Sequence, residues 1–238
     1  MEILAKMLKE SNYTVVLTGA GLSTESGLPD FRSSNGLWNN RNPLELATVD
    51  AMEHNQEEFI SFYRQRMKAL LDVVPHAGYR ILAEWADKGI IKSFITQNVD
   101  GFHTISGHKD VAQLHGTLRE CRCHNCGETY PMETFLESND LTCVCGGFIR
   151  PSVVLFGEML PEDAIHLAEE ETNNADLFIV LGSSLQVAPA NLFPQIAKQN
   201  GAKLVIVNIE QTPLDDIADL VINKRKIGEV LKEVNESI

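Results

Sequence analysis

Short apolar runs alternate with longer amphipathic segments along most of the chain. The runs are typical of buried strands, and the segments with apolar residues at helical spacing are typical of helices. Strands are predicted at 14–17, 90–95, 111–114, 153–156, 176–181, 203–207 and 220–222. Helices are predicted at the N-terminus, at 56–71, from Pro75 to Gly89, after Pro161, from near Pro189 to Gly201 and from about 227. The alternation predicts an α/β protein with an open parallel sheet.

The segment 32–74 interrupts this alternation. It contains no clear second strand, and Gly36, Asn42 and Pro43 break it. A regular dinucleotide-binding unit has its second strand and a ribose-binding acid soon after the first helix. We therefore predict an insertion here, in which the helix at 56–71 buries most of its apolar stripe.

A glycine-rich loop follows the first predicted strand. Gly19 and Gly21 flank one alanine, and Gly27 comes six residues after Gly21, so the spacing is G-x-G-x5-G and not the ordinary G-x-G-x-x-G. Such a loop lets a phosphate approach the backbone closely, which makes a nucleotide the expected ligand. A tight strand-to-helix turn without a ligand stays open as the alternative.

Polar side chains follow several predicted strands. Gln97, Asn98 and Asp100 come after the strand at 90–95, and His115 follows the strand at 111–114. Ligands bind beyond the carboxyl ends of strands in open parallel sheets, so these residues are site candidates. The alternatives are a cap for the next helix and, for His115, a structural role. Later strands end in Gly182-Ser183-Ser184 and in Asn208 with Glu210.

Five cysteines lie between Cys121 and Cys145. The pattern C-x2-C-x16-C-x-C fits the tetrahedral geometry of a zinc site. We predict Cys123, Cys126, Cys143 and Cys145 as ligands of one structural Zn²⁺, with Cys121 free. Four thiolates leave no open coordination position, so the metal has no catalytic role. A reduced cysteine cluster without metal is the alternative.

Composition narrows the class of protein. The chain has 238 residues, 44% of them hydrophobic, and a formal charge of −13. This charge predicts a soluble protein that repels nucleic acid and acidic membrane surfaces. No stretch approaches about 18 apolar residues, and the N-terminus lacks the features of a signal peptide. We expect a cytoplasmic monomer with no nucleic-acid partner and no membrane partner.

Together and in chain order, the motifs resemble those of the sirtuins, the NAD-dependent protein-lysine deacylases, over nearly the whole chain. The motifs are Gly19-Ala20-Gly21-x-Ser23-x-x-Ser26-Gly27-x-Pro29-Asp30-Phe31-Arg32, Thr96-Gln97-Asn98-Val99-Asp100-Gly101-x-His103, Leu114-His115-Gly116, two cysteine pairs, Phe156-Gly157-Glu158, Gly182-Ser183-Ser184-Leu185-x-Val187-x-Pro189-Ala190 and Val207-Asn208.

The resemblance implies a Rossmann-like NAD-binding domain made of 1–31, 76–117 and 152–238. It implies a small domain made of a helical module, 32–75, and a zinc-ribbon module, 118–151. NAD⁺ and the acyl-lysine of a protein substrate meet in the cleft between the two domains. The segment after Gly21 is then a mobile loop over the nicotinamide ribose, which accounts for the irregular glycine spacing.

The reaction implied by the resemblance is acyl transfer to ADP-ribose. The acyl amide oxygen attacks C1′ of the nicotinamide ribose as nicotinamide leaves, which gives an O-alkylamidate. His115 is the implied general base, and Asn98 and Asp100 are the implied residues that hold the carboxamide and its ribose. The products are nicotinamide, free lysine and O-acyl-ADP-ribose. An imidazole suits this role because its ordinary pKa, about 6.5, lies near the working pH.

The resemblance also implies the binding residues. For NAD⁺ they are Gly19, Ala20, Gly21, Glu25, Asp30, Phe31, Arg32, Gln97, Asn98, Asp100, Gly182, Ser183, Ser184, Asn208, Glu210 and Lys226. For the substrate they are Val154, Phe156, Gly157 and Glu158, which receive the peptide backbone as an added strand.

Ala47, Tyr63 and Arg66 have spacings that resemble the sirtuin subgroup that removes succinyl and malonyl groups. In that subgroup a small residue widens the pocket, and the phenol and the guanidinium bind the acyl carboxylate. Asp30 departs from the threonine of that subgroup. The alternative is a core position for Tyr63 and a solvated charge for Arg66, with plain deacetylation as the activity.

Two other functions stay open. A mono-ADP-ribosyltransferase or NAD glycohydrolase would use the same NAD pocket without an acyl-lysine. A zinc-ribbon scaffold would bind NAD without transferring a group, which would leave His115 without a task. The glycine spacing and the resemblance disfavour a hydride-transferring dehydrogenase.

Overall fold

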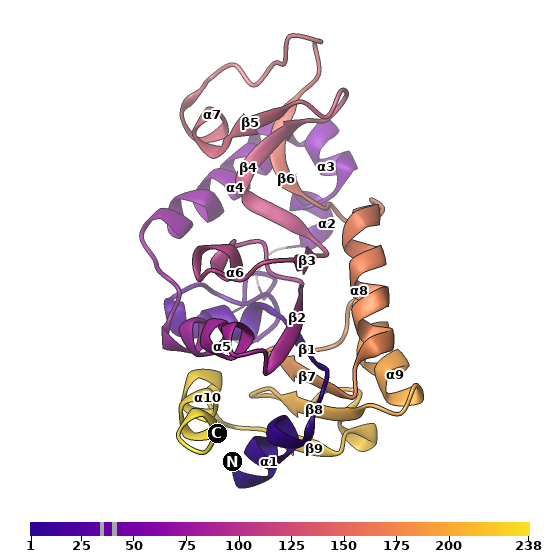
Figure 1. Cartoon of the computed structure of the whole chain (residues 1–238). Coiled ribbons are helices and arrows are strands. Elements are labelled where there is room, and N and C mark those ends of the chain that lie inside the picture. The colour runs from indigo at the N-terminus through magenta and orange to yellow at the C-terminus, as the bar shows by residue number, and fades with distance from the viewer. Residues whose placement is uncertain (34–35, 40–41) are drawn as a thin grey trace.

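A computed structural model of the chain describes residues 1–33, 36–39 and 42–238. This part of the chain forms a parallel sheet of six strands and an antiparallel sheet of three strands (Figure 1). The parallel strands are β1 (Thr14–Thr18), β2 (Ile91–Thr96), β3 (Val111–Gln113), β7 (Leu177–Leu181), β8 (Lys203–Val207) and β9 (Leu220–Ile222). The antiparallel strands are β4 (Gly116–Cys123), β5 (Thr129–Pro131) and β6 (Ile149–Val153).

The helices connect these strands. The α-helices are α1 (Glu2–Glu10), α2 (Pro43–Leu46), α3 (Val49–His54), α4 (Gln56–Leu71), α5 (Ala77–Asp87), α6 (Phe102–Ile105), α7 (Met132–Glu137), α8 (Glu162–Asn174), α9 (Leu192–Gln199) and α10 (Ile227–Asn235). The 3-10 helices are η1 (Ala20–Ser26) and η2 (Asp215–Ile217). We call the parallel sheet with α1, α5, α8, α9 and α10 the large region. We call the antiparallel sheet with α2, α3, α4 and α7 the small region.

The parallel sheet has the strand order β3-β2-β1-β7-β8-β9. Numbered along the chain within this sheet, the order is 3-2-1-4-5-6, that of the doubly wound dinucleotide-binding fold. β1 pairs in parallel with β2 on one side and with β7 on the other. The direction of the chain across the sheet reverses here, so a crevice opens at the carboxyl ends of β1 and β7. The predicted Rossmann-like α/β fold is confirmed.

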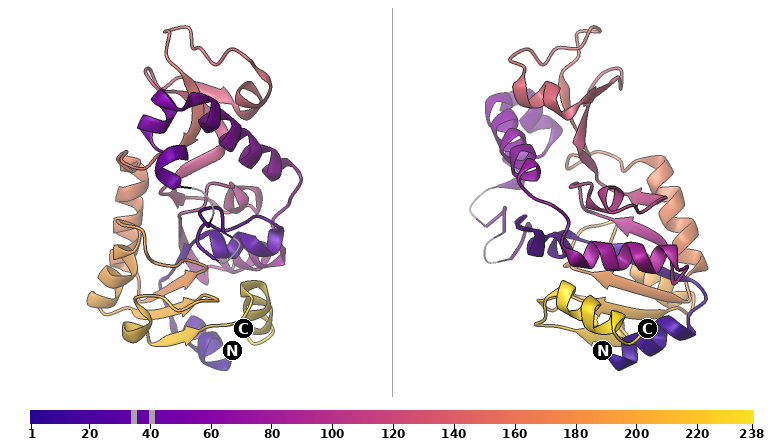
Figure 2. Two further views of the ribbon diagram at one scale, coloured as in Figure 1. Left: turned by 180° about the vertical axis from the view of Figure 1, so that it is seen from behind. Right: turned by 60° about the vertical axis from the view of Figure 1, so that its left-hand side comes forward.

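Helices cover both faces of the parallel sheet (Figure 2). Side chains alternate along each strand, because Val16 packs against α1, α5 and α10, whereas Val15 and Leu17 pack against α8 and α9. Trp85 of α5 and Phe193 of α9 are among the buried side chains on the two faces. Strands buried on both faces read as continuous apolar runs, which is the pattern of the sequence.

The small region has one hydrophobic cluster, built from two segments that are distant in the chain. Phe59 and Met67 of α4 pack with Phe135 of α7 and with Leu118 and Ile149 of β4 and β6. Figure 1 shows α4 beside β4, above the large sheet. β4 and β6 each extend two residues beyond the predicted zinc module, 118–151. The helical module 32–75 includes positions 34–35 and 40–41, which lie outside the described residues.

Local capping explains where several helices begin. The Thr48 hydroxyl accepts a hydrogen bond from the backbone N–H of Ala51 at the start of α3. His76 Nδ1 accepts one from Gly78 N–H, so α5 begins at Ala77 and not at Pro75 as predicted. Side-chain acceptors at the first turn satisfy N–H groups that have no partner within the helix.

The predicted strand at 153–156 is wrong after Val153. β6 begins earlier, at Ile149, and pairs with β4 in the antiparallel sheet. Beyond it, the Val154 N–H donates to the His115 carbonyl and the Phe156 N–H donates to the Ala47 carbonyl. These bonds lead to two separate segments, so the apolar run is extended without belonging to a ladder.

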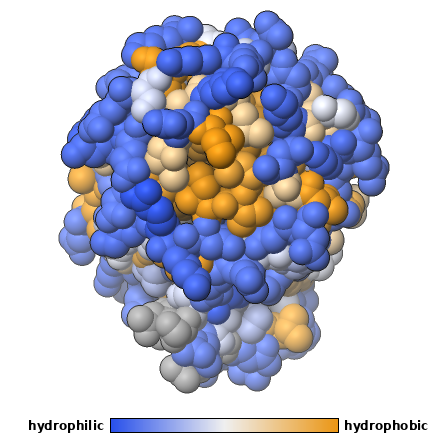
Figure 3. Space-filling model, turned by 90° about the horizontal axis from the view of Figure 1, so that it is seen from below, coloured by the Kyte–Doolittle hydropathy of each residue, from blue (hydrophilic) through white to orange (hydrophobic). Residues whose placement is uncertain are grey.

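Figure 3 looks onto the end of the large region that carries α1, and an apolar area lies there within a hydrophilic surface. Ile3 of α1 is 63% exposed. Among the described residues, no helix combines the length and the apolar composition needed to span a bilayer.

Candidate active site

A cavity of about 940 Å³ lies where the carboxyl ends of the parallel strands meet the small region. It is lined from the loop after β1, the ends of β2, β7 and β8, His115 and the segment after β6. Most of the residues predicted for NAD⁺ and for the substrate line it, in agreement with the rule for open parallel sheets. A second cavity of about 320 Å³ lies beside it, and Asp100 lines this smaller one.

The glycines let the loops after β1 and β7 touch. A Cβ on Gly19 would lie 2.6 Å from the Gly182 carbonyl oxygen, and one on Gly21 would lie 2.8 Å from Gly182 Cα. Gly182 itself has φ +67°, a conformation that favours glycine. After these contacts the chain turns into η1, and Gly27, with φ +94°, ends it. The irregular spacing therefore corresponds to a short 3-10 helix in place of a long α-helix.

Asn98 and Asp100 are held in a buried network. The Asn98 amide donates to the Gly19 carbonyl at 3.0 Å, and the Ser23 hydroxyl donates to Asp100 Oδ2 at 2.7 Å. The Tyr79 hydroxyl lies 2.8 Å from Ser23 Oγ. Burial raises the pKa of Asp100, and the hydrogen bond from Ser23 lowers it.

The sequence analysis missed two residues that lie close to Asn98 and Asp100. Tyr79 lies on α5, which reads as an ordinary amphipathic helix. Arg119 Nε donates to the Asp100 carbonyl at 2.7 Å from β4. Neither has a local motif, since both act through residues distant in the sequence.

His115 has a defined tautomer in this site. Its Nδ1 lies 3.0 Å from the Gln97 carbonyl oxygen, which can only accept, so Nδ1 carries the proton and Nε2 is free to take one. Burial lowers the pKa of His115, the bond to Gln97 raises it and the charge of Arg32 lowers it. The imidazole is therefore kept neutral, as a general base requires.

The far end of the cavity has polar groups from three strand ends. Gln97 Nε2 donates to Ser183 Oγ at 2.8 Å, and Asn208 Nδ2 donates to the Glu210 carbonyl at 2.8 Å. Ser184 also lines the cavity. All of these residues are among those predicted to bind NAD⁺.

Two predicted NAD⁺ residues, Glu25 and Lys226, line neither the large cavity nor the smaller one, and Asp100 lines only the smaller one. The Glu25 carboxylate accepts a hydrogen bond from Gly228 N–H at 2.7 Å and caps the start of α10. Lys226 is the residue before α10 and is exposed. The other predicted residues of the loop, Asp30, Phe31 and Arg32, do line the large cavity. The assignment of Glu25 and Lys226 to NAD⁺ stays a prediction.

The predicted acyl residues converge on one wall of the cavity. Ala47, Tyr63 and Arg66 all line it. The Arg66 guanidinium lies 5.1 Å from the centre of the Phe31 ring and 5.6 Å from that of Phe62. Among the described residues, no carboxylate forms an ion pair with Arg66.

The segment predicted to receive the peptide, which we call the substrate segment, borders the same cavity. Val154, Phe156, Gly157 and Glu158 line it. Phe156 is 40% exposed, and Gly157 has φ +91° with open space beside it. This edge of the chain is accessible to an added strand.

Four cysteine sulfurs form a cluster at the tip of the small region. The Sγ atoms of Cys123, Cys126, Cys143 and Cys145 lie within 4.8 Å of one another. Two pairs are 3.5 Å and 3.7 Å apart, near the separation of about 3.8 Å that Zn–S bonds of about 2.3 Å give in a tetrahedron. The Tyr130 hydroxyl donates to Cys143 Sγ at 3.1 Å.

The predicted zinc site therefore fits the residues present. A bound Zn²⁺ would cross-link the β4–β5 turn to the loop before β6 and leave no position for a substrate. Cys121 is buried in the core, outside this cluster, as predicted.

Comparisons with known proteins agree with these features. The Sir2 family model matches residues 19–189. The chain is 58% identical over 236 residues to NAD-dependent protein deacetylase 1 of Geobacillus kaustophilus, which spans 99% of this chain and 97% of that protein. It is 44% identical over 245 residues to an NAD-dependent protein deacetylase of Saccharolobus solfataricus, over 100% of this chain and 98% of that one.

Solved structures agree as well. A complex of Sir2 with a p53 peptide and NAD⁺ matches with a TM-score of 0.90 at 39% identity, over 99% of this chain and 97% of that one. A Sir2 homologue variant in complex with ADP-ribose matches with a TM-score of 0.95 at 40% identity, over 100% and 96%. The family predicted from the motifs is confirmed, and this chain belongs to the Sir2 family.

Proposed function

We propose that this enzyme is an NAD-dependent protein-lysine deacetylase that also removes succinyl and malonyl groups. The observation that carries the proposal is His115, which faces the same cavity as the glycine loops and the substrate segment, with Nδ1 bonded to the Gln97 carbonyl. NAD⁺ is the co-substrate in Sir2 structures, and proteins similar to this chain are NAD-dependent protein deacetylases.

Each residue has a task in such a reaction. NAD⁺ would supply the ADP-ribose that accepts the acyl group. The loops at Gly19 and Gly182 let its phosphates approach the backbone, and Asn98 and Asp100 hold the nicotinamide end. His115 Nε2 takes the proton of a ribose hydroxyl that attacks the acyl group. Because burial lowers the pKa of His115 below its ordinary value of about 6.5, the imidazole is still mostly neutral at that pH, and the acid limb of the pH–rate profile lies below it.

The first test is His115→Ala with an acetyl-lysine peptide. Loss of a general base lowers kcat/KM by about 10²- to 10⁴-fold, and the affinity for ADP-ribose stays the same. Full deacetylation by the variant contradicts the proposed role. Nicotinamide release by the wild-type protein without any acyl-peptide favours the mono-ADP-ribosyltransferase or NAD glycohydrolase alternative.

The Arg66 guanidinium, which forms no ion pair with any residue that the structure describes, supports the acidic acyl preference. Arg66 is half-buried against the Phe31 and Phe62 rings and lines the cavity, so a carboxylate bound in the cavity can reach its guanidinium. A succinyl or malonyl group supplies such a carboxylate, which binds through a bidentate hydrogen bond. Tyr63 adds a neutral phenol, since burial raises its pKa to about 12.

The test compares kcat/KM for succinyl-lysine and acetyl-lysine peptides of one sequence. Arg66→Met lowers the succinyl value and leaves the acetyl value nearly unchanged, so their ratio falls by about tenfold or more. Arg64→Met is the matched control, because Arg64 lies on the same helix and donates to the carbonyls of Phe135 and Ser138. An unchanged ratio in Arg66→Met leaves plain deacetylation as the activity.

A further inference from the structure

A buried arginine lies beneath the substrate segment. Arg150 of β6 is 1% exposed. Its Nη1 donates to the Val153 carbonyl at 2.9 Å, and its Nη2 donates to Glu158 Oε1. One guanidinium thus bonds both ends of the segment 153–158.

Glu158 closes the same loop from the other side. Its second oxygen, Oε2, accepts from the Leu155 N–H at 2.8 Å, and its own N–H donates to the Leu155 carbonyl at 3.0 Å. The carboxylate therefore points into the protein, with its side chain 16% exposed, and not toward a peptide. Its contribution to the site is the shape of the segment that it belongs to.

A buried ion pair is a weak source of stability, because the cost of removing both charges from water offsets their attraction. Its geometry is stricter than that of apolar packing, since the guanidinium fork and the carboxylate fix direction as well as distance. At this position the two bonded ends, Val153 and Glu158, lie on either side of Phe156 and Gly157, which line the cavity. Ordering this segment before binding removes an entropy cost from peptide association.

We propose that Arg150 and Glu158 form a positioning clamp that holds residues 153–158 in the conformation that receives the backbone of the acyl-lysine substrate. The inference rests on the proposed function, since it assumes that a peptide adds as a strand along this segment. It assigns Glu158 an internal partner in place of a direct contact with the peptide. Neither residue touches the reacting atoms.

Arg122 provides a matched control. Its Nη2 lies 3.8 Å from Glu158 Oε2, and its side chain is 42% exposed. It brings a second positive charge to the same carboxylate, whereas the Val153 carbonyl accepts its hydrogen bond from Arg150. A variant that lacks the Arg122 charge tests whether any cation near Glu158 is sufficient for peptide binding, or whether Arg150 is required.

The experiment measures the affinity for a fluorescent acetyl-lysine peptide and, separately, for ADP-ribose. The variants are Arg150→Met, Arg150→Lys, Glu158→Gln and Arg122→Met. We expect Arg150→Met and Glu158→Gln to weaken peptide binding roughly tenfold, as for a displaced positioning group, with unchanged ADP-ribose affinity. Arg150→Lys restores part of the loss, and Arg122→Met behaves as wild type. In steady-state kinetics the peptide KM rises more than kcat falls.

Unchanged peptide affinity in folded Glu158→Gln and Arg150→Lys overturns the clamp, even where Arg150→Met does not fold. An equal loss of peptide and ADP-ribose affinity also overturns it, because the pair then only stabilises the protein. A wild-type protein that neither binds nor deacylates the peptide overturns the proposed function itself, and the clamp with it.

Discussion

In the large region, each inner strand of the sheet has a neighbour on both sides and helices on both faces. In the small region, three strands and the helices α4 and α7 share a single hydrophobic cluster. The difference lies in how much apolar surface each region can bury. A small core rarely stabilises itself, and a metal cross-link is a common supplement. The cysteine cluster lies in the region whose core is smaller.

The two regions also contribute different parts of the candidate active site. The large region contributes the glycine loops and the polar strand ends to the cavity lining, and the small region contributes the residues predicted for the acyl group and leads into the predicted substrate segment. Variants that damage one region should leave much of the other intact. The four predictions below use that expectation, from the largest effect to the smallest.

Removal of zinc has the largest expected effect. A chelator should abolish the order of the small region, because the β4–β5 turn and the loop before β6 then lose their cross-link. We expect rapid amide hydrogen exchange over residues 118–151, while β1 and β7 stay protected. Metal analysis of the untreated protein should give about one zinc per chain. Active protein without metal, or exchange that is unaltered by the chelator, contradicts the comparison.

The shared cluster of the small region gives the second prediction. Phe59 is fully buried and contacts the Tyr63 and Phe148 rings, which belong to the two segments of the cluster. Phe59→Ala should lower the free energy of unfolding of this region by about 3 to 5 kcal/mol. Urea denaturation followed by exchange in α4 and β4 measures the change. Val144→Ala, at a fully exposed position, is the control with no expected loss.

Two buried histidines make the large region sensitive to acid. His103 Nε2 lies 2.8 Å from Thr18 Oγ1, its Nδ1 lies 2.6 Å from His108 Nδ1, and His108 Nε2 lies 3.2 Å from the Tyr79 carbonyl oxygen. The carbonyl fixes the tautomer of His108, and both rings are neutral in this arrangement. Burial lowers the pKa of both histidines, most strongly that of His103, whose pKa the second ring lowers further.

The sign of the effect follows from linkage. Below the ordinary pKa of about 6.5 the unfolded chain binds protons that the folded protein excludes, so stability falls as the pH falls. The slope is at most about 1.4 kcal/mol per pH unit for each histidine. Denaturation at pH 7.5, 6.5 and 5.5, followed by Trp85 fluorescence in a Trp38→Phe background, measures it. The slope should be smaller in His108→Asn than in the wild type, and a flat profile in the wild type contradicts the prediction.

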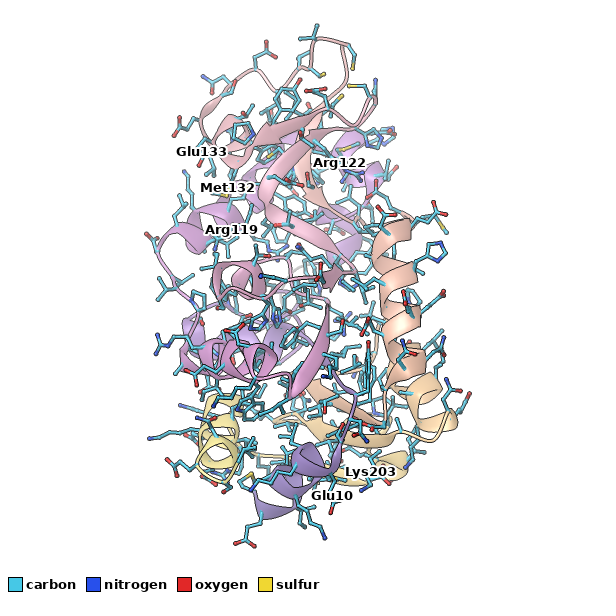
Figure 4. The ribbon with its side chains drawn as sticks, in the orientation of Figure 1. Glu10, Arg119, Arg122, Met132, Glu133 and Lys203 are labelled. Carbon is cyan, nitrogen blue, oxygen red and sulfur yellow. The ribbon has the colours of Figure 1, made fainter. Side chains whose placement is uncertain are left out.

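The smallest effect concerns an ion pair on the surface of the large region. Lys203 Nζ lies 3.6 Å from Glu10 Oε2, with both side chains about half exposed, and Figure 4 shows them close together beside α1. Lys203→Met should lower the free energy of unfolding by no more than about 0.5 kcal/mol. High salt should remove even that difference. A loss above that of Phe59→Ala would contradict the ordering of the two regions.

Local patterns in the sequence predict much of the large region. The inner strands β1, β7 and β8 are apolar runs because they are buried on both faces, and each ends in polar or small residues that line the cavity. The cysteine spacing likewise predicts the cluster. In these places the chemistry is carried by residues close together in the chain.

Contacts between residues that are distant in the chain could not be predicted from the sequence. The run after Val153 reads as a strand, yet its N–H groups bond to His115 and Ala47. Glu25 reads as part of the NAD⁺ loop, yet it caps α10 through Gly228. The pairing of Arg150 with Glu158 has no periodic signal either. In each case the partner is chosen by the packing of separate elements.

The position of β1 also has a consequence for synthesis. β1 lies in the middle of the parallel sheet, and its partner β7 ends only at Leu181. On the ribosome, the nascent chain exposes one edge of β1 until that strand has emerged, long after α1 and β2 are available. The centre of the sheet is thus completed only in the last third of translation. Until then one edge of β1 stays unpaired, and chaperones that shield unpaired edges can bind it.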